Sequence, residues 1–384
     1  MKSYRVAILG CRSRGAMAAA AYHAHPRTEL VGLCDLRQEL LDTLGQQVGV
    51  AARFTDLDEM IRSVKPDIVA LPTGTEFHFD LAMRVVDHGI DLEVEKPMCA
   101  NLEQADALMA RANERGVRVA VHHQVRVGPE MQAMARAYTA GRIGKLRYMV
   151  GSGKGYYGGY GLMNIGCHIV NNFLKFAGVC RSVSATASTD GRAVIPSDVI
   201  ASPSGMGIIV GECITATLQF DDNVTATLLH HRFPIRDNHA YLMELYGTEG
   251  RMIWSHGAWY LGQPHFIPDG QYDQWERLEL DHTEPVSKSE ETELNEYYFV
   301  DEYVRALDKQ CDHECSGADG RHTLEILMGI FESAAYGHRI DLPQVQRDHP
   351  LLRWRSEHGL GKPTEVPRQY EDWLKMEDER LGRL

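Results

Sequence analysis

The sequence predicts a doubly wound parallel α/β domain, followed by an α+β domain whose open, mostly antiparallel sheet carries helices on one face. Three observations predict it. The chain has 384 residues, more than one ordinary domain. Strand and helix patterns alternate up to about residue 123, as a parallel sheet with crossover helices requires. Beyond residue 124 the strands alternate apolar and polar residues, as in an antiparallel sheet with one packed face.

The expected boundaries are residues 1–123 for the first domain, 124–343 for the second and 344–384 for a C-terminal extension. The extension is rich in Trp, Arg, Glu and Pro and shows little periodicity. Two interpretations therefore stay open for it: an ordered extension of the second domain, or an oligomer contact.

Composition and charge argue against several kinds of partner. The chain is 44% hydrophobic and 24% charged, as globular proteins are. Its net charge of −13 argues against nucleic acid and anionic membranes. No apolar stretch has the length of a membrane span, and the first strand begins too early for a secretory signal. The eight cysteines are scattered, so a cytoplasmic protein with reduced thiols is expected.

The first strand, turn and helix have the pattern of a dinucleotide site. Gly10 closes the strand VAIL and Gly15 opens an alanine-rich helix, which leaves backbone N–H groups at the helix N-terminus for a pyrophosphate. The next strand ends in Asp35, whose carboxylate can accept both ribose hydroxyls of an adenosine. Arg12 stands where the middle glycine of the motif usually lies.

The strand ends are the places to look for chemistry, because ligands of parallel sheets bind outside the carboxyl ends of the strands. Three further strands are expected in segments 66–73, 91–97 and 117–123. They end at Thr73, at Glu95-Lys96-Pro97, and at His122-His123, of which only one histidine can face the site. A lysine there could stabilise a developing alkoxide, or the Glu-Lys pair could be an ordinary solvated pair.

The second domain offers further candidates. The segment GSGKGYYGGYG (151–161) supplies Tyr156, Tyr157 and Tyr160, whose rings and hydroxyls suit a sugar, although a flexible hairpin explains the segment equally well. The segment 311–315 has at most three metal ligands at an atypical spacing, so a polar loop is expected and no metal site.

Six segments together resemble the glucose–fructose oxidoreductase/inositol dehydrogenase (Gfo/Idh/MocA) family. The matches run in order from residue 4 to about residue 343, and the most specific is the tripeptide Glu95-Lys96-Pro97 with its upstream His78. The segments are ILGCRSRG (8–15), LPTGTEFHFDLAMRVVDHGIDLEVEKPM (71–98), HQVR (123–126), NIGCHIVN (164–171), LYGTEGRM (245–252) and ESAAYGHRIDLP (332–343).

The resemblance implies an N-terminal Rossmann domain that binds NAD or NADP. Asp35 favours NAD because it would repel the 2′-phosphate of NADP, while Arg37 leaves NADP possible. The residues expected to bind the cofactor are Gly10, Arg12, Ser13, Arg14, Gly15, Asp35, Arg37, Thr73, His78, Glu95 and Gln124.

The resemblance also implies the catalytic residues. Lys96 matches the family's active-site lysine, and His168 falls on the general acid/base position. Asn164 stands where the family usually has an acid, four residues before the histidine, and an amide can bind a hydroxyl but cannot hold a proton. Arg126 is expected to bind substrate together with Tyr156, Tyr157 and Tyr160.

The family typically oxidises a CH–OH group of a sugar or cyclitol, or reduces the corresponding ketone, so we expect an NAD(P)-dependent oxidoreductase of carbohydrate metabolism. One alternative is an enzyme that retains NAD and uses transient sugar oxidation for glycoside cleavage or elimination, with which Asn164 is compatible. A second is a sensor that binds dinucleotide without turnover. A homodimer or homotetramer is expected by resemblance.

Overall fold

The computed structural model, which describes residues 2–262, 275–280 and 293–384, divides into two units. Unit 1 comprises Met1–Pro129 and Asp281–Arg321, and unit 2 comprises Glu130–Leu280 and His322–Leu384. The chain passes from unit 1 to unit 2 after Pro129, six residues beyond the expected boundary at residue 123 (129 − 123). The larger difference is that residues 281–321 belong to unit 1, although the sequence placed them in the second domain.

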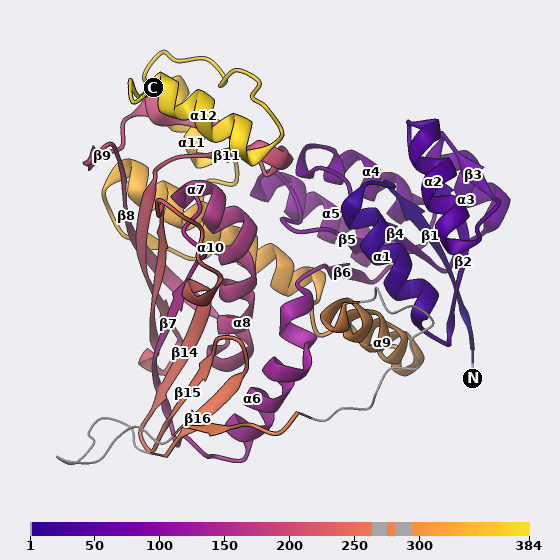
Figure 1. Cartoon of the computed structure of the whole chain (residues 1–384), viewed down its shortest axis with the longest axis horizontal. Helices are drawn as coiled ribbons and strands as arrows, with labels where there is room; N and C mark the ends of the chain where they lie inside the picture. Colours follow the sequence, from indigo (N-terminus) through magenta and orange to yellow (C-terminus); the bar gives the residue numbers. More distant parts are fainter. Residues whose placement is uncertain (1, 263–274, 281–292) are drawn as a thin grey trace. The chain divides into compact units, whose positions relative to one another are not determined.

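Unit 1 contains a six-stranded parallel sheet in the order β3-β2-β1-β4-β5-β6. This order reverses between β1 and β4, which is the switch point where ligands of such sheets bind. Strands β4, β5 and β6 are short and largely buried, as parallel strands covered by helices must be. The strands are β1 (Tyr4–Leu9), β2 (Thr28–Cys34), β3 (Arg53–Phe54), β4 (Ile68–Leu71), β5 (Asp91–Val94) and β6 (Val119–Val121) (Figure 1).

Two of the crossover helices of unit 1 show recognisable capping residues. Asp56 accepts a hydrogen bond from the Glu59 N–H at the start of α3, and Gly116 ends α5 with a left-handed backbone. The helices are α1 (Ser13–Ala24), α2 (Gln38–Val48), α3 (Leu57–Val64), α4 (Thr75–Asp87), α5 (Leu102–Arg115) and the 3-10 helix η1 (Gln124–Val127).

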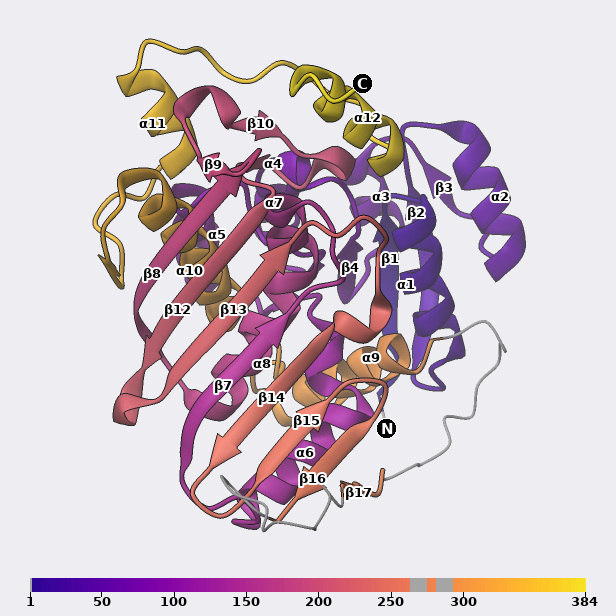
Figure 2. The ribbon, with the colours of Figure 1, turned by 60° about the vertical axis from the view of Figure 1, so that its left-hand side comes forward.

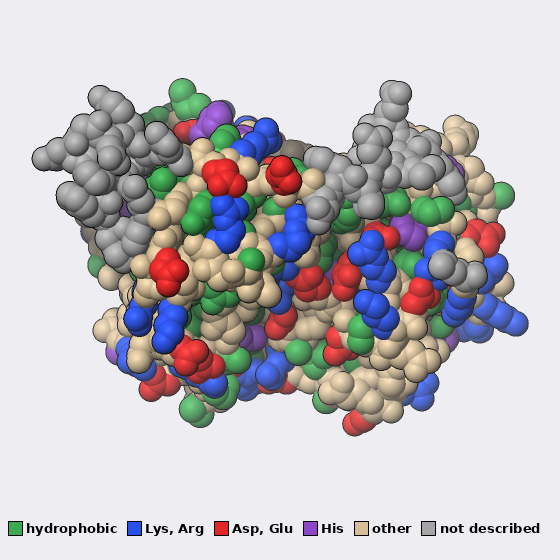
Figure 3. All heavy atoms as spheres, turned by 90° about the horizontal axis from the view of Figure 1, so that it is seen from below, with side chains coloured by type: hydrophobic (Ala, Val, Ile, Leu, Met, Phe, Trp, Pro, Cys, Tyr) green, Lys and Arg blue, Asp and Glu red, His purple; other side chains and the backbone are tan. Residues whose placement is uncertain are grey.

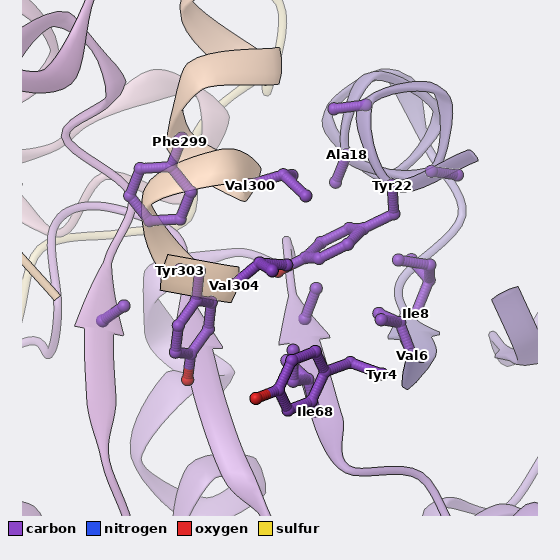
Figure 4. Packing of buried hydrophobic residues seen from close by; sticks show 14 of the residues in the cluster. Tyr4, Val6, Ile8, Ala18, Tyr22, Ile68, Phe299, Val300, Tyr303 and Val304 are labelled. Atoms are coloured by element: carbon purple, nitrogen blue, oxygen red, sulfur yellow. The ribbon is translucent and has the colours of Figure 1, made fainter. Parts of the chain in front are cut away.

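Helix α9 (Leu294–Lys309) returns to unit 1 from late in the sequence. Its buried face includes Phe299, Tyr303 and Val304, which pack in one cluster with Tyr22 of α1 and residues of the sheet. Figure 4 shows Val304 beside Tyr22, and Phe299 and Tyr303 farther from Tyr22 along the same helix. The apolar face of α9 is therefore the physical reason that this segment leaves the domain to which the sequence assigned it.

Unit 2 is built on a ten-stranded sheet in the order β17-β16-β15-β14-β7-β13-β12-β8-β18, with β9 paired to β8. Among the described strands of this sheet, only β7 and β13 pair in parallel, so the expectation of a mostly antiparallel sheet is confirmed. Figure 2 shows the strands from β8 to β16 side by side. They are β7 (Leu146–Ser152), β8 (Cys180–Thr189), β9 (Arg192–Ala193), β12 (Cys213–Phe220), β13 (Thr225–His231), β14 (Leu242–Gly247), β15 (Arg251–Trp254), β16 (Ala258–Leu261), β17 (Glu276–Arg277) and β18 (Ile340–Asp341).

Helices cover the buried face of this sheet. Gly151 of β7 lets Ile169 and Phe173 of α8 approach, because a Cβ at this glycine would lie 2.4 Å from the Ile169 side chain. On β8, β12 and β13 the opposite face carries many Thr and Ser residues, which are partly buried or exposed. The helices are α6 (Pro129–Thr139), α7 (Gly158–Gly161), the π-helical turn η2 (Leu162–Gly166), α8 (Cys167–Ala177) and α10 (Gly317–Tyr336).

The C-terminal extension is an ordered part of unit 2, which agrees with the first of the two interpretations of the sequence. It contains α11 (Pro350–Glu357) and α12 (Tyr370–Arg380), which lie beside the segment of β10 (Ile200–Ala201) and β11 (Ile208–Ile209) (Figures 1 and 2). Trp373 of α12 is fully buried and donates from Nε1 to the carbonyl of Ala201 over 2.9 Å. The segment of β10 and β11 also includes the 3-10 turns η3 (Pro196–Asp198) and η4 (Pro203–Gly205). Two further 3-10 turns, η5 (Asp221–Asn223) and η6 (Asn238–Ala240), follow along the chain.

The surface charge is mixed. Figure 3 shows Lys and Arg side chains beside Asp and Glu side chains over the face that it presents. Among the described residues several ion pairs are exposed, such as that of Arg181 with Asp221 at 2.7 Å. Within the described residues, no helix is long and apolar enough to cross a membrane.

Candidate functional site

The turn between β1 and α1 is formed by two glycines that approach closely. Gly10 has a φ of +108°, and a Cβ built at Gly15 would lie only 1.9 Å from the Gly10 carbonyl oxygen. Side chains are therefore excluded at Gly15, and the first turn of α1 can lie against the strand end. Helix α1 has no side-chain cap at Arg12, so its first N–H groups remain available to an anion. Arg12 and Ser13 are exposed beside them.

Asp35 is oriented at the end of β2 by two backbone N–H groups. Oδ2 accepts from Cys11 N over 2.8 Å, and Oδ1 accepts from Arg37 N over 2.9 Å. Each carboxylate oxygen keeps a further lone pair for a ribose hydroxyl. The Arg37 side chain is half exposed and lies 3.4 Å from Glu39, so it is within reach of solvent.

The ends of β4, β5 and β6 gather the other predicted residues of unit 1. His78 is fully buried, with Nδ1 2.9 Å from the Pro97 carbonyl and Nε2 3.2 Å from the Thr73 carbonyl. It therefore joins the segments after β4 and β5, and burial lowers its pKa. Lys96 is itself buried, at 7% exposure, beside Glu95. Lys96-Pro97 is a cis peptide bond.

Arg14, which the sequence grouped with the cofactor residues, is held by two buried carboxylates. Its Nε donates to Glu95 over 3.1 Å and its Nη1 donates to Glu296 of α9 over 3.0 Å. Burial alone would raise the pKa of Glu95, but Arg14, His122 and Lys96 outweigh burial and lower it. Arg14 thus fixes the residue that precedes Lys96 along the chain.

His122 continues this network through the core of unit 1. Its Nδ1 lies 2.6 Å from Glu93 and its Nε2 lies 2.7 Å from Glu296, while Tyr22 Oη donates to Glu93 over 2.5 Å. Burial alone would lower the pKa of His122, but the carboxylates of Glu296 and Glu93 outweigh it and raise the pKa to about 10. His122 is therefore a protonated partner of two acids, not a group that faces a ligand.

Sequence reasoning missed Glu296, because 282 residues separate it from Arg14. The only local signal was a carboxylate among the apolar residues of EYYFVDEYVRAL. The other predicted residue of this region, Arg126, is also ion-paired in unit 1, with Nη2 2.9 Å from Asp319. Its guanidinium is buried, so the structure gives it a structural partner where the sequence expected a substrate.

In unit 2, Asn164 and His168 lie on either side of a change in helix type. Asn164 belongs to the π-helical turn η2 and His168 to the first turn of α8. π-helical turns inside helices often accompany functional sites. His168 is 6% exposed, and Asn164 is partly buried with its Nδ2 donating to Tyr160 Oη over 3.2 Å.

The segment before α8 is shaped around His230 of β13. Cβ atoms at Gly153 or Gly166 would lie 2.4 Å and 2.7 Å from its ring. Burial lowers the pKa of His230 to about 3, so the ring is neutral. The glycines of the tyrosine-rich segment therefore serve close packing rather than movement.

The three tyrosines of this segment differ from one another. Tyr157 is fully buried, and its Oη donates to Glu377 of α12 over 3.1 Å. The structure therefore assigns Tyr157 to the packing of the extension, which corrects its expected place among the substrate-binding residues. Tyr160 is 6% exposed, and only Tyr156 of the three is partly open to solvent.

The residues of unit 1 fit a dinucleotide. Gly10 and Gly15 form a turn without side chains, the N-terminus of α1 is uncapped, and Asp35 is oriented at the ribose position. At the sheet edge, Thr73 Oγ1 and Gln124 Oε1 are buried, and neither has a hydrogen-bond partner among the described residues. Two buried polar atoms at the carboxyl ends of β4 and β6 are what an amide-bearing ligand would satisfy.

The fold and site therefore define a dinucleotide-binding protein with a second α+β unit. An oxidoreductase family with an NAD-binding Rossmann fold matches residues 4–123. Residues 4–123 match this family, Gfo/Idh/MocA, so the resemblance drawn from the motifs is confirmed, and the chain is an NAD-binding oxidoreductase.

The similar proteins extend the match over most of the chain. D-apiose dehydrogenase of Paraburkholderia graminis is 22% identical over 94% of this chain and 96% of its own. D-glucoside 3-dehydrogenase of Escherichia coli is 25% identical over 59% of this chain and 67% of its own. The structure of levoglucosan dehydrogenase in complex with NADH and levoglucosan shares the fold, with a TM-score of 0.74, 17% identity, and coverage of 89% and 100%.

Proposed function

We propose that this chain oxidises a CH–OH group of a sugar, a cyclitol or a sugar derivative with NAD, or reduces the corresponding ketone. The observation that carries the proposal is Lys96, a buried lysine at the carboxyl end of β5, held beside Glu95 within a domain that binds NAD. The names of the two similar dehydrogenases support a carbohydrate substrate.

Each proposed catalytic residue has one role. Bound NAD supplies a hydride acceptor at its nicotinamide ring. His168 takes the proton of the substrate hydroxyl as general base. Lys96, as a charged donor, stabilises the negative charge that develops on the oxygen. Asn164 contributes a hydrogen bond that orients the substrate, since its amide cannot exchange a proton.

We propose Asp35 as the residue that selects NAD over NADP. Both of its oxygens are fixed by backbone N–H groups, so the carboxylate cannot turn away from a 2′-phosphate. Of Asp35 and Arg37, only Arg37 could bind the 2′-phosphate of NADP. A titration with both cofactors, followed by protein fluorescence, tests this: NAD should bind at least tenfold more tightly.

The experiment that tests the function is absorbance at 340 nm with purified protein, NAD or NADP, and a panel of D-glucose, D-apiose, methyl glucosides, levoglucosan and inositols. Product analysis is done on the same samples. NADH formed in proportion to product supports the dehydrogenase. Product formed without NADH supports the alternative in which NAD is retained for glycoside cleavage or elimination. Tight NAD binding with neither signal favours a sensor.

We further propose a cytoplasmic homodimer or homotetramer. The Thr- and Ser-rich face of the unit 2 sheet supports a subunit contact, because Val150, Leu242 and Ile253 lie among its polar residues and are only partly buried. All eight cysteines are free thiols, as a cytoplasmic location would require. Light scattering of the purified protein gives the oligomer mass, and a monomer would contradict this contact.

A further inference from the structure

Glu296 of α9 holds two cations at once in the core of unit 1. Its Oε1 accepts from Arg14 Nη1 over 3.0 Å, and its Oε2 lies 2.7 Å from His122 Nε2. The side chain is 1% exposed. Burial alone would raise the pKa of Glu296, but His122 and Arg14 outweigh burial and lower the pKa to about 2. The carboxylate is therefore ionised, and each of its oxygens has a charged partner.

Both cations connect this α9 carboxylate to the end of β5. Arg14 Nε donates to Glu95 over 3.1 Å, and His122 Nδ1 lies 2.6 Å from Glu93. Glu93 belongs to β5, and Glu95 is the first residue after it. Helix α9 is thus linked to this strand at two points that lie two residues apart (95 − 93), immediately before Lys96.

Arg14 depends on Glu296 for its fixed orientation. Among the described residues, Arg14 forms ion pairs with Glu95 and Glu296 alone. Its side chain is 32% exposed, so solvent reaches it from one side. Two carboxylates on different nitrogens fix the plane of a guanidinium, whereas one carboxylate lets it turn. Without Glu296, the guanidinium can therefore turn toward solvent and draw Glu95 with it.

The inner end of this network is closed. Tyr22 Oη donates to Glu93 over 2.5 Å, and Tyr22 is fully buried in the hydrophobic core. The ring of His122 lies against Phe299 of α9, with ring centroids 4.4 Å apart. The network thus ends among packed aromatic rings and has no outlet to solvent at this end, which favours an anchor over a path for protons.

We propose that Glu296 and Arg14 are positioning residues, which act through Glu95 to hold Lys96 in place. This proposal rests on the proposed function, in which Lys96 contacts the substrate oxygen. Neither Glu296 nor Arg14 is given a contact with the reacting atoms. Helix α9 begins 198 residues after Lys96 (294 − 96), so a late segment of the chain sets the position of a catalytic group of the N-terminal sheet.

The position of Lys96 is tested without turnover, by brief treatment of the full-length protein with acetic anhydride. The tryptic peptide 85–111 contains Lys96 as its one lysine, and trypsin does not cut a Lys–Pro bond, so mass spectrometry assigns the acetyl group directly. In the wild type, Lys96 is 7% exposed and should react slowly compared with the exposed Lys145. In Glu296→Gln this ratio of rates should rise about threefold or more, because a loosened segment opens more often.

The matched control is Asp301→Asn on the same helix. Asp301 pairs with Arg305 at 2.7 Å and lies 3.3 Å from His25, so its loss also removes a charge of α9. Neither of these partners belongs to the network of Glu296. Asp301→Asn should therefore leave the ratio of the two acetylation rates as it is in the wild type.

Arg14→Met is the second variant, because it removes the link to Glu95 from a partly exposed position and leaves Glu296 in place. It should raise the acetylation ratio as Glu296→Gln does. An unchanged ratio in Arg14→Met overturns the proposal, and so does an equal rise in Asp301→Asn, which would show a general loosening of α9.

The consequence for catalysis is measured with the panel substrate that gives NADH. Glu296→Gln should lower kcat by ~10- to 100-fold, as a displacement of ~1 Å at a reacting group can do. The Kd for NAD should change by less than about threefold. In a Lys96→Ala background the same change should have no further effect on kcat, because the positioned group is gone.

The two kinds of failure are distinguishable. Additive losses of kcat in the double variant would overturn positioning through Lys96, since a merely structural role of Glu296 would act independently of that lysine. Wild-type protein that forms no NADH with any panel substrate contradicts only the proposed function. The acetylation of Lys96 then still decides whether Glu296 and Arg14 hold this residue in place.

Discussion

At the scale of single residues, the turn between β1 and α1 depends on two positions that carry no side chain. The sequence motif predicted Gly10 and Gly15, and the structure gives the physical reason for each: a positive φ at Gly10 and a carbonyl 1.9 Å from any Cβ at Gly15. The motif could not predict that Arg14 faces two carboxylates. That depends on Glu296, which no local pattern connects to the turn.

The first prediction concerns Gly15→Ala. The added methyl group would overlap the Gly10 carbonyl, so the turn must open and the first N–H groups of α1 must move. We expect NAD affinity to fall by at least tenfold, measured by fluorescence titration. Gly361→Ala is the matched control, because no atom lies within 4 Å of a Cβ there and its φ is not positive. Unchanged affinity in Gly15→Ala would contradict the assigned turn.

The second prediction concerns Lys96→Ala. Removing a donor that stabilises a developing negative charge typically lowers kcat by ~100- to 1000-fold. The Kd for NAD should change by less than about threefold, since the proposed role of Lys96 is on the substrate oxygen. Lys145→Ala, at an exposed position of unit 2, is the control and should keep full activity. Wild-type turnover in Lys96→Ala would remove this residue from the mechanism.

At the scale of elements, local patterns predicted most helices and strands, but not which unit each joins. The alternation of apolar and polar residues predicted the strands of unit 2 correctly, because this signal comes from neighbours in sequence. The place of α9 depends on a core of Phe299, Tyr303 and Tyr22 that forms only in three dimensions. Glu296 of this helix then completes the hydrogen-bond network of His122.

The third prediction follows from the pKa of His122, which Glu296 and Glu93 raise to about 10 against the opposing effect of burial. A pKa raised above the unfolded value of about 6.5 means that the protonated form is stabilised in the folded state. This stabilisation is fully present below about pH 6.5 and is lost as the pH rises toward about 10.

Urea unfolding of the wild type at pH 6, 8 and 10 should therefore show a falling free energy of unfolding. In His122→Gln the group that titrates is absent, so the part of the slope that belongs to this histidine should disappear. The variant should also be less stable at pH 6, because two buried carboxylates lose their charged partner. Parallel slopes for the two proteins would show that His122 is not charged in the fold.

The fourth prediction concerns α12. Trp373 is fully buried, packs edge-on against Tyr157 at 5.0 Å between ring centroids, and hydrogen-bonds to Ala201. Trp373→Ala should lower the free energy of unfolding by ~3–5 kcal/mol, as for other large buried side chains. Lys375→Ala, on the exposed side of the same helix, should change it by less than ~0.5 kcal/mol. Equal stabilities would show that the extension does not pack as described.

At the scale of the whole molecule, the sequence predicted two domains and their sheet types, because the change from a parallel to an antiparallel pattern is visible along the chain. It could not predict that the chain returns to unit 1 with residues 281–321. Nor could it predict that the extension packs on the tyrosine-rich segment, since those contacts join residues more than 200 positions apart, such as Tyr157 and Glu377.

The last prediction uses this division into units. The residues expected to bind NAD, from Gly10 to Gln124, all lie in unit 1, so NAD should stabilise that unit by mass action. At a concentration one hundred times its Kd, the gain is ~2.7 kcal/mol. In calorimetry, NAD should therefore raise the Tm of the transition that contains unit 1. Gly15→Ala should lose this shift, while Trp373→Ala, which lowers the stability of unit 2, should keep it. If Trp373→Ala abolished the shift as well, the cofactor site would depend on the extension, and the assignment of NAD binding to unit 1 alone would be wrong.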